Sequence, residues 1–201
     1  MKKKTYKMGL VGCMSVLVML TGLWVYDQNK IPVSEEPVVS IKNDEPKQEE
    51  TKEKINYPYL DENVKVVRTY YDQNDDTTTQ QASLVLFEGV YRPNQGTDFA
   101  NENTKFDVVA CLSGEVTQKK DDPIFGLMVT IKSNDIEVTY QSLDSTTLEV
   151  NQKVKQGDVI GTSGENLYEA DLGNHLHLII ENKGVILNPE KCFSKTVDEL
   201  S

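Results

Sequence analysis

Short runs of strand-forming residues, separated by turn residues, dominate the chain from residue 57 onward. Valine, isoleucine, tyrosine and phenylalanine fill the runs, and Gly, Asn and Asp stand between them, which is the pattern of short β-strands joined by turns. Ser133-Asn134-Asp135 is a good hairpin signal between two of them. The clearest runs are residues 64–71, 82–87, 106–111, 127–131, 136–140 and 185–187. With almost no helical periodicity, this pattern predicts an all-β domain of antiparallel sheets. We expect the domain to span residues 57–192, with a core at 84–189 and a C-terminal tail at 193–201.

Residues 27–56 have a different composition. Acidic residues alternate with lysines, prolines recur, and apolar residues are few. Such a segment cannot bury enough apolar surface to offset the entropy lost on ordering. We therefore predict a disordered acidic linker that acts as a tether.

The preceding run, residues 8–26, is uncharged and mostly apolar. As a helix it would rise roughly 28 Å, close to the thickness of the hydrocarbon core of a bilayer. A cleavable signal peptide would have a shorter apolar core and a small-residue cleavage site. A lipobox-like Leu10-Val11-Gly12-Cys13 is also present, but little apolar sequence precedes it. We predict one retained transmembrane helix, with the basic tail at 1–7 in the cytoplasm and the remainder outside it.

Charge and cysteine content narrow the classes of function. The net charge is −11 with a pI near 4.7, which argues against nucleic acid as a partner because phosphates require a basic surface. Cys13 lies in the predicted membrane segment, which leaves Cys111 and Cys192 outside it. These two could form a disulfide in an oxidising compartment or remain buried free thiols, and the sequence leaves both open.

Candidate chemistry gathers at His175 and His177, the two histidines of the chain. Residues two apart on a strand project from the same face, so the two imidazoles would stand side by side. A His-x-His pair on a strand suits a metal ligand beside a second ligand or an acid/base. Two half-exposed histidines on an ordinary strand are an equally good interpretation of the pair alone.

Several spaced motifs occur in a recognisable order around this pair. They are Gly96-x-Asp98, Ala110-x-x-x-Gly114-x-Val116, Tyr140-x-x-Leu143, a glycine-rich stretch from Val154 to Gly164, and His175-x-His177. Over residues 84–189 this order resembles the lysostaphin-type (LytM) zinc endopeptidase domain. The resemblance implies an antiparallel groove built on a duplicated hybrid motif, and cleavage of peptide cross-links in peptidoglycan. It also implies zinc held by a His-x-x-x-Asp motif and by the second His of His-x-His.

The chain departs from that pattern at two positions. Asn94 stands where the His-x-x-x-Asp motif should begin, and Ser142 stands where a catalytic histidine is expected. Asn94 is a poor zinc ligand, so Asp98 and His177 fall one short of the three protein ligands usual at catalytic zinc. Ser142 cannot act as an acid or base as imidazole does. We therefore expect no catalytic residue and no zinc, with Asn94, Asp98, Ser142, His175 and His177 as vestiges of a peptidase site.

The lost residues, the anchor and the tether together resemble a degenerate branch of the family found in endospore-forming bacteria. That resemblance implies a sporulation protein anchored in the forespore membrane, with its domain in the space facing the mother cell. There it would bind the ectodomain of a mother-cell membrane protein in a channel or secretion-like complex that serves engulfment and late forespore gene expression. An active zinc endopeptidase and a non-catalytic activator of a cell-wall hydrolase remain alternatives. Peptidoglycan remains a possible ligand.

An antiparallel sheet offers edges to which a partner strand can add. We expect the partner to contact the loop at 119–125 and two neighbouring strands. The residues predicted to bind it are Val129, Ile131, Ile136, Val138 and Tyr140.

Overall fold

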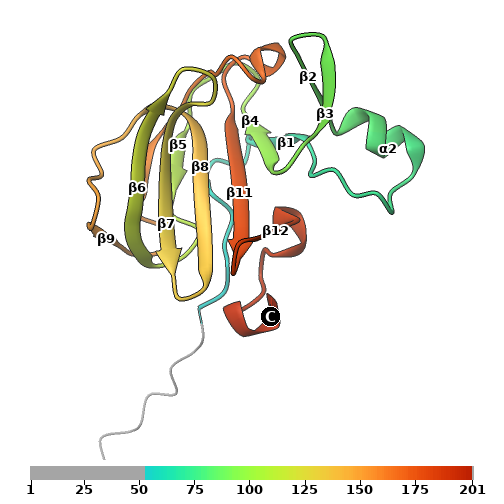
Figure 1. Ribbon diagram of the computed structural model, residues 1–201. Helices are drawn as coiled ribbons and strands as arrows, with labels where there is room; N and C mark the ends of the chain where they lie inside the picture. Colours follow the sequence, from blue (N-terminus) through green and yellow to red (C-terminus); the bar gives the residue numbers. More distant parts are fainter. Residues whose placement is uncertain (1–52, 201) are drawn as a thin grey trace, which may run out of the picture. The chain divides into compact units, whose positions relative to one another are not determined.

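The computed structural model describes residues 53–200, which form one compact unit (Figure 1). The predicted basic tail, the apolar run at 8–26 and most of the predicted linker lie outside the described residues. Within 53–200, no helix is both long and apolar enough to cross a membrane.

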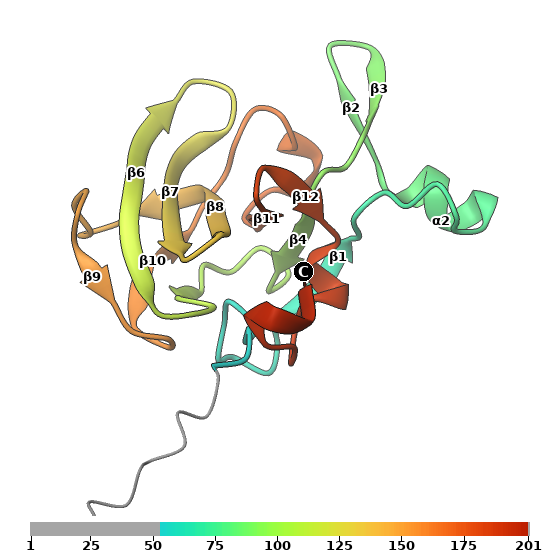
Figure 2. The ribbon, with the colours of Figure 1, turned by 60° about the horizontal axis from the view of Figure 1, so that its bottom comes forward.

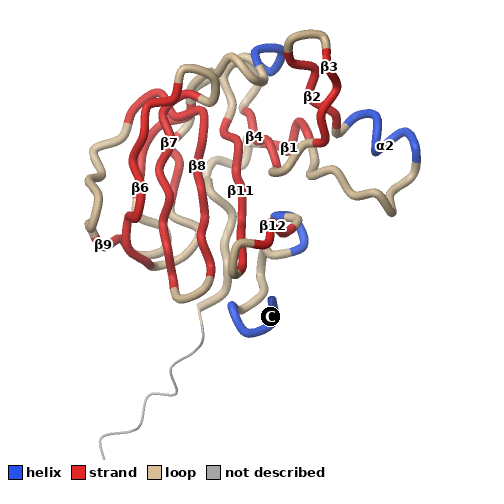
Figure 3. The backbone as a smooth tube through the Cα atoms, viewed as in Figure 1, coloured by secondary structure: helices blue, strands red, loops and turns tan. Residues whose placement is uncertain are grey.

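Strands are the main regular secondary structure of the described chain, as predicted (Figure 3). The strands are β1 (Lys65–Arg68), β2 (Leu84–Phe87), β3 (Val90–Pro93), β4 (Thr97–Ala100), β5 (Asp107–Val109), β6 (Gly114–Asp122), β7 (Gly126–Ser133), β8 (Ile136–Ser145), β9 (Lys153–Val154), β10 (Val159–Ser163), β11 (Leu176–Asn182) and β12 (Val185–Leu187). The helices are α2 (Thr77–Ala82) and the short 3-10 turns η1 (Ala170–Leu172), η2 (Pro189–Lys191) and η3 (Val197–Leu200).

The main sheet runs in the order β1-β4-β11-β8-β7-β6-β9, with each neighbouring pair antiparallel (Figure 2). β10 pairs with both β5 and β8, and β12 pairs with β11. β2 and β3 form a separate hairpin that stands beside the main sheet (Figure 1). The predicted all-β antiparallel class is confirmed.

The strands β7 and β8 supply much of the hydrophobic core. Val129 pairs with Tyr140, and Ile131 pairs with Val138, so each pair projects from the same face of the sheet. Their side chains are fully buried, as is Ile136. The prediction that these residues bind a partner is therefore wrong. Period-2 alternation turns the apolar positions toward the core and leaves the intervening residues, such as Thr139, for the opposite face.

The ordered domain extends beyond its predicted bounds at both ends. Ile55, placed in the linker by its sequence, is fully buried, and Phe193 from the predicted tail packs in the same core cluster. Ile55 N–H donates to the carbonyl of Lys195 at 2.9 Å, and Ser194 N–H donates back to the carbonyl of Ile55 at 2.8 Å. Long-range backbone pairing thus holds the two ends of the domain together.

One local feature differs from the sequence-based prediction, and another decides a question that the sequence left open. Helix α2 was not predicted, because its sequence TTTQQA has no apolar stripe. It is stabilised at its start by the Asp76 carboxylate, which accepts hydrogen bonds from the N–H groups of Thr78 and Thr79. Cys111 and Cys192 are buried free thiols.

Candidate functional site

One row of side chains crosses four adjacent strands of the sheet. Arg68 on β1 lies opposite Asp98 on β4, Asp98 lies opposite His177 on β11, and His177 lies opposite Gln141 on β8. Directly opposed residues on antiparallel strands share a face. The strand register therefore places a guanidinium, a carboxylate and an imidazole next to one another on the face opposite the core.

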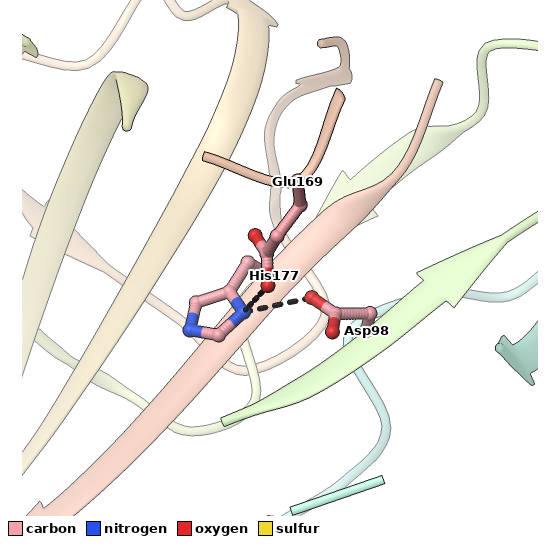
Figure 4. A group of neighbouring side chains, drawn as sticks. All are labelled: Asp98, Glu169 and His177. Atoms are coloured by element: carbon pink, nitrogen blue, oxygen red, sulfur yellow. Dashed lines mark hydrogen bonds and ion pairs between the residues drawn. The ribbon is translucent and has the colours of Figure 1, made fainter. Parts of the chain in front are cut away.

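Asp98, Glu169 and His177 form the centre of this arrangement (Figure 4). The Nδ1 atom of His177 lies 2.7 Å from Oδ1 of Asp98 and 3.2 Å from Oε1 of Glu169. His177 is 5% exposed, Asp98 is fully buried, and Glu169 is 1% exposed. Because Nδ1 faces two carboxylate oxygens, it carries a hydrogen and donates it.

The buried charges shift the pKa of each group. Burial alone would lower the pKa of His177, but the charges of Asp98 and Glu169 outweigh it and raise that pKa to about 10. Burial acts to raise the pKa of Glu169, but the His177 charge and several hydrogen bonds hold it well below its usual range. Complete burial raises the pKa of Asp98, with the His177 charge acting against it.

Arg68 adds a second buried positive charge. Its side chain is 8% exposed, and Nη2 lies 2.5 Å from Oδ2 of Asp171, while Nη1 lies 4.0 Å from Oε1 of Glu169. We call Arg68, Asp98, Glu169 and His177 the ion cluster.

Asn94 is held as a donor toward the ion cluster. Its Nδ2 donates to Oδ2 of Asp98 at 2.9 Å and to the carbonyl of Thr69 at 3.1 Å. Next to it, Gly96 leaves no room for a side chain, because an added Cβ would lie 2.7 Å from Nε2 of His177. The Asn94–Gly96–Asp98 segment thus packs directly against the His177 ring.

Ser142 and His175 lie together in a second part of the site. Nδ1 of His175 donates to the carbonyl of Gly173 at 2.8 Å, and its Nε2 lies 2.9 Å from Oγ of Ser142. Asn166 donates to that hydroxyl at 2.6 Å. Burial would lower the pKa of His175, but its hydrogen bond to Glu169, at 3.3 Å, and nearby negative charge raise it. Glu169 therefore connects both histidines.

Phe87, Phe125 and Tyr168 form an aromatic cluster next to this second part of the site, where the N–H of Ser142 donates to the carbonyl of Phe125 at 3.2 Å. The Tyr168 ring lies 5.2 Å from that of Phe87 and 5.1 Å from that of Phe125, measured between centroids. The N–H groups of Leu167 and Tyr168 donate to the carbonyl of Ile124. Ser142 and His175 are both 0% exposed. A peptide substrate therefore has no access to them in this conformation.

The sequence predicted part of this constellation. Asn94, Asp98, Ser142, His175 and His177 do gather at one site, as their spacing indicated. Glu169, Arg68 and Asn166 were missed. A Glu in the loop before the His175 strand was the one visible signal, and nothing in the sequence around Arg68 indicates that it reaches the site.

By residue type, Asp98, Glu169 and His177 could hold a metal ion, since one donor atom from each lies within 4.8 Å of the others. As arranged, however, they do not fit zinc. The Nδ1 atom of His177 donates a hydrogen, whereas a zinc-bound nitrogen must offer a lone pair. Asn94 directs an N–H toward Asp98, and the Arg68 guanidinium lies beside Glu169. That the protein binds no zinc in solution stays a prediction.

The family model of peptidase family M23 matches residues 92–189. The chain is also 38% identical to a chain in the structure of the SpoIIQ–SpoIIIAH pore-forming complex, with a TM-score of 0.72, covering 75% of this chain and 97% of that one. The chain belongs to peptidase family M23. The M23 match contains every vestigial site residue predicted above, and it excludes Arg68.

Curated and solved relatives agree with this membership. The chain is 39% identical over 151 residues to stage II sporulation protein Q of Bacillus subtilis (strain 168), covering 74% of this chain and 53% of that protein. It thus spans about half the length of this relative. A zinc-containing peptidase from Vibrio cholerae shares the fold at 22% identity and a TM-score of 0.55, covering 68% of this chain and 39% of that one.

Proposed function

We propose that this protein is a non-catalytic M23 scaffold that is anchored in the forespore membrane and binds the ectodomain of stage III sporulation protein AH from the mother cell. The complex would form part of a channel or secretion-like assembly between the two cells, serving engulfment and late forespore gene expression. In this proposal residues 8–26 are the anchor and the domain faces the intermembrane space.

The closed site is the observation that carries the non-catalytic part. Metal-dependent hydrolysis needs an activated water and a base that the substrate can approach. Ser142 occupies the position of the expected base, and both it and His175 are completely buried. Three further contacts, from Asn94, Arg68 and Asn166, tie the polar groups of the site to one another.

Similarity to solved complexes supports the partner. The chain is 39% identical, with a TM-score of 0.66, to a chain in a crystal structure of SpoIIIAH and SpoIIQ, covering 68% of this chain and 98% of that chain. The relatives in these structures assemble with SpoIIIAH, and the same fold is present here.

The outer edge of β6 offers a place for a partner strand. β9 pairs with β6 at Gly114 and Glu115, and no described residue adds a strand from Thr117 to Asp122. Unpaired N–H and C=O groups along such an edge can bind an extended segment by β-augmentation. The adjoining turn carries Ile124, which is 37% exposed. This edge overlaps the loop at 119–125 that the sequence already suggested.

A binding assay tests the proposal. The full chain, purified in detergent, is titrated with the purified ectodomain of stage III sporulation protein AH from the same organism. Wild-type protein should bind, and Ile124→Asp should weaken binding by about tenfold or more if Ile124 lies within the interface. Val185→Asp is the matched control: Val185 is 62% exposed, lies in the β11–β12 hairpin, and should leave binding unchanged.

Two further assays separate the alternatives. Incubation of the protein with peptidoglycan and zinc should release no new amino termini. Release that is lost in a His175 variant would instead support the zinc endopeptidase alternative. Stimulation of a separate cell-wall hydrolase, without binding to the AH ectodomain, would favour the activator instead. Equal binding by Ile124→Asp and wild type would reject the β6 edge as the interface while leaving the partner in place.

A further inference from the structure

Arg68 is the member of the ion cluster that lies outside the M23 match. It comes from β1, the first strand of the sheet, and its register with Asp98 carries its side chain onto the site face. The side chain is 8% exposed, which is unusual for arginine unless it is paired. One nitrogen, Nη2, is paired with Asp171 at 2.5 Å.

The other terminal nitrogen is directed at the site without a hydrogen bond. Nη1 of Arg68 and Oε1 of Glu169 are both buried, and neither has a hydrogen-bond partner among the described atoms. They lie 4.0 Å apart, so their interaction is mainly between charges. Arg68 therefore supplies positive charge to the buried carboxylate of Glu169.

Glu169 also supplies the donor that Asn94 cannot. Asp98, Glu169 and His177 are of the residue types that bind zinc, and their donor atoms already lie within 4.8 Å of one another. The count of three protein ligands is thus met by a residue from the loop before β11. What stands against a metal ion is the neighbouring charge of Arg68 and the hydrogen on His177 that Asp98 accepts.

We propose that Arg68 takes the place of the metal in this M23 site, and that neutralising Arg68 converts Asp98, Glu169 and His177 into a zinc-binding site. With Arg68 present, Glu169 has a buried cation of the protein 4.0 Å away, shared with Asp171, and Asp98 has the His177 imidazole. Without it, a divalent ion is the available countercharge for the two carboxylates. The proposal concerns this chain's own residues and is independent of the partner.

Zinc calorimetry on the full chain in detergent, at neutral pH, tests this. Arg68→Gln should bind zinc at least about tenfold more tightly than wild type, the scale on which groups next to the ligands alter metal affinity. Arg68→Lys keeps the charge and should behave as wild type does. Adding His177→Ala to Arg68→Gln should abolish the gain. Equal zinc affinity of Arg68→Gln and Arg68→Lys would overturn the proposal, as would wild-type binding as tight as that of Arg68→Gln.

A second readout covers the case in which Arg68→Gln does not fold without metal. Zinc should then restore its β-sheet circular dichroism and raise its melting temperature, and it should do neither for Arg68→Gln/His177→Ala. Failure of zinc to restore the fold of Arg68→Gln would also overturn the proposal.

Discussion

Glu169→Gln is the most informative single substitution for the stability of the domain. Glu169 is 1% exposed and contacts Nδ1 of His177 at 3.2 Å, Nε2 of His175 at 3.3 Å and Nδ2 of Asn166 at 3.1 Å. Glutamine keeps the shape and one oxygen acceptor but removes the negative charge. Arg68 and His177 then lose a countercharge inside the protein.

Removing one partner of a buried ion pair costs about 3–5 kcal/mol. Because glutamine can still accept the hydrogen bond from Asn166, we expect the lower end of that range, about 3 kcal/mol. For a domain of this size the corresponding fall in melting temperature is roughly 6–12 °C. The assay is urea unfolding at pH 7, followed by circular dichroism.

The control is Glu149→Gln. Glu149 pairs with Lys119 at 2.9 Å, but its side chain is 76% exposed, so its loss should change the free energy of unfolding by less than about 1 kcal/mol. A loss of under about 1 kcal/mol in Glu169→Gln, similar to the control, would refute the view that the ion cluster stabilises the fold through buried charge.

Three further measurements follow from the structure. The pKa of His177 is raised from 6.5 to about 10, so its contribution to the free energy of unfolding is complete below about pH 6.5 and is lost as the pH rises through about 10. Urea unfolding at a series of pH values should show this fall in stability, and an equal fall in a His177→Gln variant would contradict it. Tyr140→Phe removes the hydroxyl that accepts a 2.7 Å hydrogen bond from the N–H of Cys111, so unfolding experiments should record a loss of about 1–3 kcal/mol; an unchanged free energy would mean that another group satisfies the N–H. Burial raises the pKa of the Cys111 thiol to about 12 and that of the Cys192 thiol to about 11, so both should resist alkylation until the protein is denatured. Mass spectrometry of the native protein after iodoacetamide treatment checks this, and rapid labelling of either thiol would contradict its buried position.

The sequence predicted the elements of the site better than its surroundings. Period-2 runs and hairpin turns identify the strands, and the spaced motifs place Asp98, Ser142 and His177 in one site. Glu169 escaped notice because its loop has no regular pattern, although it lies only a few residues before His175. Arg68 escaped because only the pairing of β1 with β4 reveals that it lies next to Asp98.

The predicted partner surface failed for a physical reason. Val129 and Tyr140 were predicted to lie near the partner surface, but the alternation of side chains along a strand decides which face they occupy. Which of the two faces is covered depends on long-range packing, here with Phe99, Leu176 and other core residues. Because side chains alternate along a strand, neighbouring residues occupy opposite faces, and a shift of one residue exchanges a core position for a surface position.

The joined ends of the domain determine how it would respond to a mechanical load. A pull applied through the chain on the N-terminal side first reaches Ile55, whose backbone is bonded to Ser194 and Lys195, and Lys54, whose carbonyl accepts from Gln156. The bonds of Ile55 pass the load to the C-terminal turns, whereas the bond from Gln156 passes it to the turn after β9, the strand that pairs with β6. The load is therefore shared between the C-terminal turns and the β9 side of the main sheet. In the arrangement proposed above, a pull on the anchor is thus resisted jointly by the two ends of the domain and by its sheet.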